Sequence, residues 1–283
     1  MSESSPSQAK KTWFITGASR GFGRALAEVA LRHGDRVFGT VRGGRSHGLD
    51  PLPGLEIVKL DVTDPAAVKR AIDDTWQKAG QVDILVNNAG YGVLGAIEEV
   101  SEEDIRQVFE TNVFGLMAVT RAALPHLRKQ RSGHLLNLSS VGGLVGIAGY
   151  GFYNATKFAV EGFSEALSYE LAPLGIHVTI VEPGPYRTDF LEGSSLKTSA
   201  SHIADYEPSV GATRKAADER RGKQVGDPVR AAELIYRVTL EEKPPLRLVL
   251  GKPAIDLARK KFAQVEADIA AWEQPSVDTA YPG

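Results

Sequence analysis

The chain has 283 residues, of which 42% are hydrophobic and 24% are charged, and its formal net charge is −2. These values are ordinary for a soluble globular protein, and they disfavour one that gathers nucleic acid or anionic membrane by charge. Cysteine is absent, which excludes disulfides, thiolate metal sites and cysteine nucleophiles. The first residues lack the apolar core of a signal peptide, and no apolar stretch is long enough to span a bilayer. We therefore expect a cytoplasmic protein.

Short apolar or β-branched runs alternate with helical patterns along most of the chain. We expect strands at 13–16, 36–41, 55–60, 84–86, 134–138, 177–181 and 246–250. We expect helices at about 24–33, 65–79, 101–130, 151–172, 228–240 and 254–272. Such alternation is typical of parallel strands joined by right-handed crossovers, with helices on both faces of the sheet. The sequence thus predicts an α/β fold with a doubly wound parallel sheet of the Rossmann type.

No internal repeat or low-complexity linker divides the chain. We therefore predict a single domain over residues 11–273, between a disordered tail at 1–10 and a loose tail at 274–283. Within the domain the pattern breaks down from about 186 to 225, where polar and charged residues mix with isolated apolar ones. A long irregular segment in a compact domain is usually functional or disordered. Because this one directly follows a strand end, we expect it to fold over a pocket as a lid.

Acidic residues gather before and after Ser101. Ser101 with Asp104 approximates a capping box, which marks the start of a helix. Carboxylates are favourable at such a start, because the helix dipole is positive there. We therefore interpret the pairs Glu98-Glu99 and Glu102-Glu103 as a solvated helix start, not as a catalytic carboxylate pair.

Tyr153 and Lys157 carry the strongest chemical signal. Residues four apart share one face of a helix, so the ammonium lies near the phenol. A nearby cation favours the phenolate, and the tyrosine then exchanges a proton more readily than a free phenol of pKa ~10. Alone, this pair is more often two ordinary surface residues. Here Ser140 precedes it, together with a Gly-rich turn near the start and an Asn-Asn-Ala-Gly run. The combination argues against the surface-pair interpretation.

The Gly-rich turn runs from Thr16 to Gly23, directly after the first predicted strand and before a helix. Its spacing is G-x-x-x-G-x-G, not the more general G-x-G-x-x-G. Glycines at such a turn let the backbone approach a pyrophosphate that sits on the positive N-terminus of the helix. The turn therefore predicts a dinucleotide site.

This set of features resembles the short-chain dehydrogenase/reductase family over about residues 11–190, and beyond that in architecture only. The matching positions are Thr16 to Gly23, Asp61, Val62, Asn87 to Gly90, Asn112, Ser140, Tyr153, Lys157, Pro183, Gly184 and Thr188. The resemblance implies an oxidoreductase that transfers a hydride between a nicotinamide cofactor and a ketone or secondary alcohol.

The resemblance also implies four catalytic residues. Tyr153 would be the general acid in carbonyl reduction and the base in alcohol oxidation. Lys157 would hold the nicotinamide ribose and stabilise the tyrosinate. Ser140 would donate a hydrogen bond to the substrate oxygen, where negative charge develops. Asn112 would anchor a water that links Lys157 to solvent. Ser139 should point to the opposite face of its strand, so we interpret it as structural.

The same resemblance implies where the cofactor binds. Asp61 and Val62 would hold the adenine, and Thr188 with the backbone near Tyr186 would hold the carboxamide. Tyr186 replaces a residue that is usually smaller and aliphatic, which would reshape the pocket. The full expected cofactor set is Gly17, Ser19, Arg20, Gly21, Phe22, Gly23, Arg42, Asp61, Val62, Asn88, Ala89, Gly90, Tyr153, Lys157, Pro183, Gly184, Tyr186 and Thr188.

The choice of cofactor follows from the end of the second predicted strand. NAD-binding members of the family carry an acidic residue there, which bonds the adenine ribose hydroxyls. This strand ends in Val41 and Arg42, with no carboxylate between Asp35 and Asp50. Arg20 in the Gly-rich turn would face the same ribose. Two guanidiniums suit a 2′-phosphate, so we predict NADP(H).

An apolar substrate is expected, with contacts from Leu144, Phe190 and Leu196. Leu144 lies in the Gly-rich, apolar stretch 142–151, which forms either a substrate wall or part of the core. Phe190 and Leu196 lie in the expected lid. Together these residues predict a carbonyl reductase of an apolar ketone.

Two other functions stay open: a non-catalytic dinucleotide-sensing or interaction protein, and a sugar-nucleotide epimerase or dehydratase. The Ser140, Tyr153 and Lys157 set argues against a sensor, and the short chain after Thr188 argues against the epimerase. Net consumption of NADPH would separate the reductase from both. The histidines show no metal-ligand spacing, so no metal is expected. By resemblance, the helices around Asn112 and Tyr153 would pair into a homodimer or homotetramer, and the C-terminal helix could block one such interface.

Overall fold

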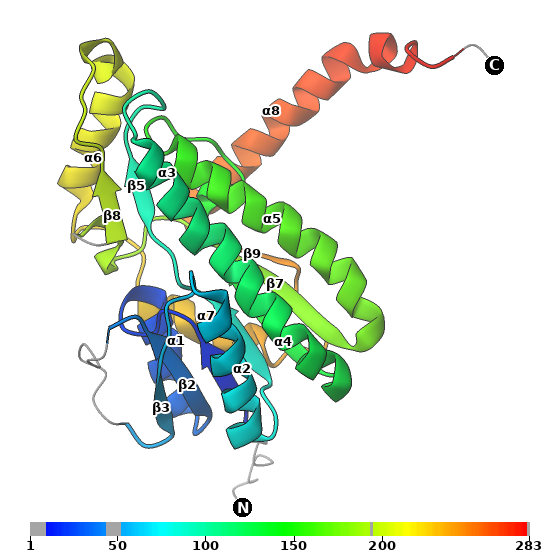
Figure 1. Cartoon of the computed structure of the whole chain (residues 1–283). Coiled ribbons are helices and arrows are strands. Elements are labelled where there is room, and N and C mark those ends of the chain that lie inside the picture. The colour runs from blue at the N-terminus through cyan, green and yellow to red at the C-terminus, as the bar shows by residue number, and fades with distance from the viewer. Residues whose placement is uncertain (1–9, 44–51, 193–194, 282–283) are drawn as a thin grey trace, which may run out of the picture.

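A computed structural model describes residues 10–43, 52–192 and 195–281. Its centre is a seven-stranded sheet in the order β3-β2-β1-β4-β6-β7-β9, in which every pairing is parallel (Figure 1). The strands are β1 (Thr12–Ile15), β2 (Arg36–Val41), β3 (Leu55–Lys59), β4 (Ile84–Asn87), β6 (Gly133–Leu138), β7 (Ile176–Pro183) and β9 (Arg247–Leu250). The order reverses at β1, as in a doubly wound sheet. The predicted α/β fold is therefore confirmed.

Helices cover both faces of the sheet. They are α1 (Gly21–Arg32), α2 (Pro65–Ala79), α4 (Leu116–Gln130), α5 (Gly151–Leu171) and α7 (Pro228–Val238). Helix α1 packs on α7, α2 packs on α4, and α5 packs on β7. The predicted ranges agree with these helices to within a few residues, except in the first turn of α1 and in the long helix predicted at 101–130.

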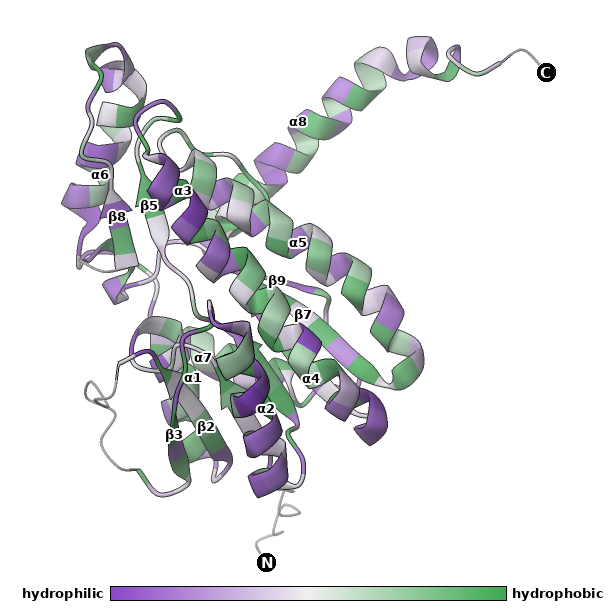
Figure 2. Ribbon diagram, in the orientation of Figure 1, coloured by the Kyte–Doolittle hydropathy of each residue, from purple (hydrophilic) through white to green (hydrophobic). Residues whose placement is uncertain are grey.

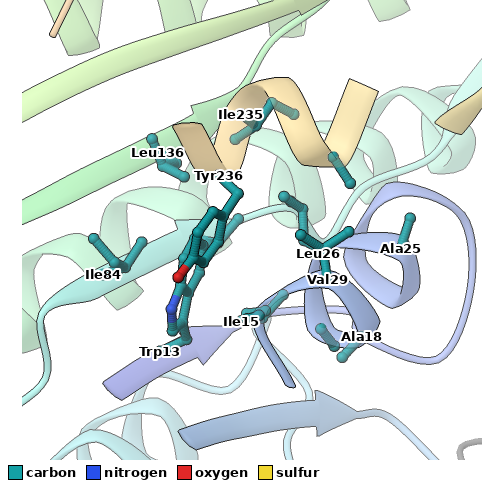
Figure 3. Close-up of a cluster of buried hydrophobic side chains, with 14 of the residues drawn as sticks. Trp13, Ile15, Ala18, Ala25, Leu26, Val29, Ile84, Leu136, Ile235 and Tyr236 are labelled. Atoms are coloured by element: carbon teal, nitrogen blue, oxygen red, sulfur yellow. The ribbon is translucent and has the colours of Figure 1, made fainter. Parts of the chain in front are cut away.

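The core divides into two layers because β1 is buried on both faces. Alternate side chains of a strand point to opposite faces. Trp13 and Ile15 accordingly join Leu26 and Tyr236 in the cluster under α1 and α7 (Figure 3). Phe14, between them, joins the other cluster, under α2 and α4. This continuous apolar run is what a central strand of a parallel sheet requires.

The single helix predicted at 101–130 is interrupted. It consists of α3 (Glu102–Phe109), a π-helical turn η1 (Glu110–Gly115) and α4. Asn112, inside η1, is buried and makes side-chain hydrogen bonds to Tyr91 and Thr156. Wide turns of this kind often occur at functional sites. Periodicity alone does not reveal the interruption, because one extra residue shifts the helical pattern only slightly.

The segment expected to be irregular, 186–225, is more ordered than predicted. It contains η4 (Asp189–Leu191), β8 (Leu196–Thr198) and α6 (Ala212–Arg220). Strand β8 pairs in parallel with β5 (Gly92–Leu94), which the sequence did not predict. Figure 1 shows β8 and α6 standing beside β5 and α3, beyond the end of the central sheet.

Glu99 corrects the interpretation of the acidic cluster. Its side chain is fully buried and forms an ion pair with Arg214 of α6. Its carboxylate also accepts hydrogen bonds from the backbone N–H groups of Ala96 (2.7 Å) and Ile203 (2.8 Å). Glu98, Glu102 and Glu103 are exposed, as expected. Glu99 was misread because Ile203 and Arg214, which bind its carboxylate, lie more than a hundred residues away in the sequence.

The last helix, α8 (Lys252–Val277), is longer than predicted and includes part of the expected loose tail. Only Ala254 and Ala258 are buried, and the helix projects away from the sheet (Figure 1). Hydrophobic and hydrophilic residues alternate along its exposed length (Figure 2). In the described part of the chain, no helix is long and apolar enough to cross a membrane. Nearly all of the tail expected at 1–10 lies outside the described residues.

Candidate active site

A cavity of about 1060 Å³ opens at the carboxyl ends of the central strands. Residues that follow β1, β3, β4 and β6 line it, including Gly17, Leu60, Asn88 and Ser140. In open α/β sheets, ligands bind in the crevice at this edge, beside the point where strand order reverses. Every residue of the expected cofactor set except Gly23 lines the cavity, as do Ser140, Tyr153 and Lys157. Positions far apart in the sequence therefore meet in one space.

The Gly-rich turn has the geometry of a phosphate cradle. Gly17 and Gly21 have φ angles of 66° and 54°, in the left-handed region that favours glycine. Helix α1 starts at Gly21, and in the described part of the chain no hydrogen bond from the N-cap side chain closes its first turn. The N–H groups of that turn and the positive end of the helix suit an anionic diphosphate. The residues present therefore fit a dinucleotide.

Gly23 and Asn88 pack against the backbone of this turn. A Cβ at Gly23 would overlap the carbonyl oxygen of Gly17 and the amide of Asn88. The Asn88 side chain donates hydrogen bonds of 2.9 Å to the carbonyl oxygens of both Thr16 and Gly17. Gly23 is thus needed for packing of the helix on the turn, where the sequence suggested direct cofactor contact.

The end of the cavity beside β2 is positively charged. Arg42, at the end of β2, is exposed and lines the cavity together with Arg20. Within the described residues 36–43, no side chain is acidic. Asp61 also lines this end, and its carboxylate accepts hydrogen bonds from the backbone and hydroxyl of Thr63.

Tyr153 and Lys157 lie on α5, and both line the cavity. Burial raises the pKa of Tyr153 to about 12, against the opposing effect of a hydrogen bond with Ser140. The Lys157 Nζ lies 5.8 Å from the Tyr153 ring centre and donates a 2.7 Å hydrogen bond to the Leu138 carbonyl oxygen. Desolvation therefore outweighs the hydrogen bond with Ser140, and the phenol holds its proton, whereas the sequence suggested easier ionisation.

Lys157 is itself almost fully buried. Burial lowers its pKa to about 8, and the carboxylate of Glu161, one helical turn further on, opposes this shift. At neutral pH the ammonium is thus mostly charged. It can donate hydrogen bonds into the cavity beyond the one that Leu138 accepts.

Ser140 follows β6 and faces the same cavity. Its Oγ accepts a 3.0 Å hydrogen bond from the Gly142 N–H and lies 3.5 Å from the Pro183 carbonyl oxygen. The second contact is long, so the hydroxyl proton is available to a ligand. Ser139 is buried, and its side chain lies beside that of Glu161, whose pKa is raised mainly by burial.

Asn112 does not line the cavity. Its Oδ1 accepts from the Tyr91 N–H at 3.0 Å, and its Nδ2 donates to the Tyr91 carbonyl oxygen (2.8 Å) and the Thr156 hydroxyl (3.1 Å). The side chain thus ties the loop after β4 to α5, one residue before Lys157. A water-anchoring role for Asn112 stays a prediction.

The other end of the cavity is apolar and aromatic. The Phe190 ring lies 5.5 Å from the Tyr153 ring, and the ring of Tyr150, the residue directly before α5, lies 6.1 Å from it. Small residues of α6 form part of the same wall: Ala212, Thr213, Ala216 and Ala217. Tyr150 and α6 were not predicted from the sequence to line the site, although the four-residue repeat of small residues indicates one face of a helix.

Two expected substrate residues do not line the cavity. Leu196 lies in β8 opposite Gly92, where its side chain packs on the small two-stranded sheet. Leu144 follows the short turn η2 (Val141–Gly143) and is only partly buried. Of the three expected contacts, the structure brings only Phe190 to the cavity, beside Tyr153. Among the residues that the structure describes, no cluster of acidic or histidine side chains could hold a metal ion.

The sequence matches the family model for short chain dehydrogenases over residues 11–198. Among known proteins, oxidoreductase BOA17 from Botryotinia fuckeliana is 38% identical over 276 residues, which cover 95% of this chain and 99% of that protein. The 3-ketodihydrosphingosine reductase from Bacteroides thetaiotaomicron is 36% identical over 239 residues, with 84% and 86% covered.

Solved structures show the same likeness. A short-chain dehydrogenase from Streptomyces avermitilis has a TM-score of 0.90 at 42% identity, covering 96% of this chain and 100% of that one. A relative from Burkholderia phymatum in complex with NAD has a TM-score of 0.81 at 26% identity, covering 92% and 95%. ElxO with NADP bound has 0.73 at 26%, covering 87% and 99%. Relatives of this fold therefore bind NAD or NADP, and the likeness alone does not choose between them.

Proposed function

Because this chain belongs to the short chain dehydrogenase family and is an oxidoreductase of that family, we propose that it reduces an apolar ketone with NADPH, or oxidises the corresponding secondary alcohol with NADP⁺. One observation carries the proposal: Tyr153, Lys157 and Ser140 line the same cavity as the Gly-rich turn, with Phe190 beside the tyrosine. A proton donor, a cation and a hydroxyl thus surround the space between the cofactor cradle and an apolar wall.

Each side chain has a distinct role in this reaction. The cofactor, when bound, supplies or takes the hydride at the carbonyl carbon. Tyr153 keeps its proton at neutral pH, because burial raises its pKa to about 12, and donates it to the carbonyl oxygen. Ser140 donates a hydrogen bond to the same oxygen as negative charge develops there. Lys157 places a positive charge beside the phenol and stabilises the tyrosinate that remains.

NADP(H) is the proposed cofactor, held along the carboxyl ends of the strands. The turn from Gly17 to Gly21 would hold the diphosphate on the N-terminus of α1. Arg20 and Arg42 would grip the 2′-phosphate, since a guanidinium bonds phosphate oxygens in pairs. The lack of a carboxylate at the end of β2 supports the same choice, because an acidic side chain there would repel the phosphate.

An apolar substrate is supported by the lining of the other end. Phe190 and the alanines of α6 offer carbon surface beside the polar side chains of Thr213 and Arg220, and apolar ligand surface gains from burial against carbon. The relative named as a 3-ketodihydrosphingosine reductase is 36% identical. A ketone on an aliphatic chain or an aromatic ring is therefore the class to test first.

The direct test is NADPH oxidation, followed by loss of absorbance, with aliphatic, aryl and steroid ketones. We expect turnover with at least one of them, and turnover with NADH should be far lower. A protein that binds NADPH and consumes none with any ketone would be better explained as a dinucleotide sensor. An epimerase would convert its substrate without net NADPH consumption.

We also propose that the protein is cytoplasmic and forms a homodimer or homotetramer. Phe114 of η1 is 54% exposed, and Phe158 and Tyr169 of α5 are 45% and 69% exposed. Large apolar side chains on two neighbouring helices suit burial against a second copy. The cytoplasmic location is supported by a sequence without cysteine.

A further inference from the structure

Two carboxylates are buried behind the catalytic lysine. Glu161 follows Lys157 by one turn on α5, and Glu182 lies on β7, directly before Pro183. The side chain of Glu161 is 8% exposed and that of Glu182 is not exposed. Neither takes part in the reaction described above, yet isolated charges at such positions are costly. Their burial so close to the site calls for a physical explanation.

The guanidinium of Arg247 lies within 4 Å of both carboxylates. The Arg247 Nε lies 3.4 Å from an oxygen of Glu161 and 3.6 Å from an oxygen of Glu182. The same side chain gives its better contact, 2.6 Å from a terminal nitrogen, to Glu165, which is 41% exposed. Within the described residues, all four oxygens of Glu161 and Glu182 lack a hydrogen-bond partner of ordinary geometry. One positive charge therefore faces three carboxylates.

Both buried carboxylates lie within 4 Å of one nitrogen, and after burial the charge of Glu161 and a hydrogen bond with it also raise the pKa of Glu182. Two carboxylates that share a site cannot both ionise easily, and one proton remains on the pair. The groups around the pair are Lys157 and Glu165 on α5, Arg247 on β9 and the Ser139 hydroxyl after β6. The only cations among them, in the described part of the chain, are Lys157 and Arg247. Burial raises the pKa of both acids.

We propose that Glu161 and Glu182 share one proton inside the protein. The negative charge left on Glu161 then positions the Lys157 side chain and keeps its amine protonated. This inference rests on the proposed function for its effect on turnover, but the shared proton belongs to the fold and can be measured without a substrate. Glu161 and Glu182 are positioning residues, since neither lines the cavity.

Two isosteric substitutions should shift the pH at which turnover falls in opposite directions. Turnover should fall as the pH rises through the pKa of Lys157, which burial lowers to about 8 and Glu161 raises. Glu161→Gln removes the nearby negative charge, so this fall should move to lower pH by about one unit, the usual effect of one close charge. Glu182→Gln releases the shared proton and leaves Glu161 fully ionised, so the fall should move to higher pH. A general loss of packing would not produce shifts of opposite sign.

Two further measurements need no turnover. The infrared carbonyl band of a protonated carboxylic acid should be present in the wild type near neutral pH and absent in Glu182→Gln. The second measurement is the free energy of unfolding as a function of pH. A folded-state pKa above the unfolded value gives stability that is present at low pH and lost as the pH rises through the folded value. Above about pH 4.3, the unfolded carboxyl value, Glu182→Gln should therefore flatten the decline in stability.

Glu165→Gln is the matched control, because Glu165 also contacts Arg247 but is half exposed. It should leave the acid band and the pH at which turnover falls unchanged. The inference is overturned if Glu161→Gln and Glu182→Gln shift turnover in the same direction, or if Glu182→Gln keeps the wild-type acid band. If no ketone is turned over, the proposed function fails, while the band and the stability profile still decide whether the proton is shared.

Discussion

Tyr153 keeps its proton because its hydroxyl lies in a desolvated site, where the charged phenolate is disfavoured. Burial raises its pKa to about 12, although Ser140 opposes the shift. The cation that favours ionisation, Lys157, has its ammonium drawn to the Leu138 carbonyl oxygen. A phenol that is protonated at neutral pH is ready to act as an acid, which favours the direction of carbonyl reduction.

Substitution of Tyr153 by Phe tests this role. The ring and its contacts with Phe190 and Tyr150 remain, and only the hydroxyl is lost. We expect kcat to fall by about 10²- to 10⁴-fold, the usual contribution of general acid catalysis, with little change in NADPH affinity. Steady-state kinetics and equilibrium fluorescence titration measure the two effects. Turnover within a few-fold of the wild type would remove Tyr153 from the mechanism.

At the scale of elements, α6 and β8 are attached to the rest of the fold by charged pairs. Arg214 of α6 pairs with the buried Glu99, and Lys197 of β8 pairs with Asp104 of α3. The pKa of Glu99 is lowered: burial would raise it, but hydrogen bonds from Ile203 and Ala96 and the charge of Arg214 outweigh burial. These contacts hold α6, which forms one wall of the cavity, in place, so movement of this segment as a lid requires that at least one pair opens.

Breaking the buried pair should loosen that wall. Arg214→Met leaves Glu99 charged and buried, which costs about 3–5 kcal/mol of stability when a buried partner is removed. We expect a lower unfolding temperature, faster proteolysis between residues 195 and 225, and a higher KM for the ketone. Lys215→Met, on the exposed face of the same helix, is the control and should change none of these. Equal protection from protease in both variants would contradict the anchoring role.

Phe190 and Leu196 test which residues of this segment meet the substrate. Phe190 faces Tyr153 in the cavity, whereas Leu196 packs between β8 and β5. Phe190→Ala should change the relative kcat/KM among ketones by about 10-fold or more, since a fully buried aromatic ring is worth about 1.5–3 kcal/mol. Leu196→Ala should lower stability and leave that ranking unchanged. If Leu196→Ala alters the ranking more than Phe190→Ala does, the substrate lies elsewhere in the cavity.

At the scale of the whole molecule, the cofactor cavity joins segments from most of the chain, so ligand binding should stabilise the entire fold. A ligand at 100 times its Kd adds about 2.7 kcal/mol of stability. We expect NADPH to raise the unfolding temperature more than NADH at equal concentration. Arg42→Ala should remove most of that difference without lowering the unfolding temperature of the free protein, because Arg42 is exposed.

Arg42 is a better position for this test than its neighbour Val41. Val41 is 2% exposed, so an acidic residue there would place a carboxylate in the core and confuse cofactor choice with stability. Arg36→Ala, at the other end of β2, is the matched control and should keep the preference for NADPH. Equal thermal shifts with NADPH and NADH in the wild type would reject the proposed choice of cofactor.

The sequence by itself determined the sheet and the identity of the chemical groups. Strand β2 and helix α2 begin and end where the apolar and helical patterns predicted, because these signals are local. The Gly-rich turn and the Tyr153 and Lys157 pair were recognisable for the same reason, since each motif lies within a few neighbouring residues. Their meeting in one cavity follows from the parallel topology, which brings all strand ends to one edge.

Only the tertiary structure decided how the groups are used. Gly23 supports the turn, Asn112 braces a loop, and Glu99 holds α6, each through partners distant in the sequence. The same holds for the protonation of Tyr153 and for the Glu161 and Glu182 pair. Desolvation and the separation of charges depend on which segments pack together, and that information is not present in residue order alone.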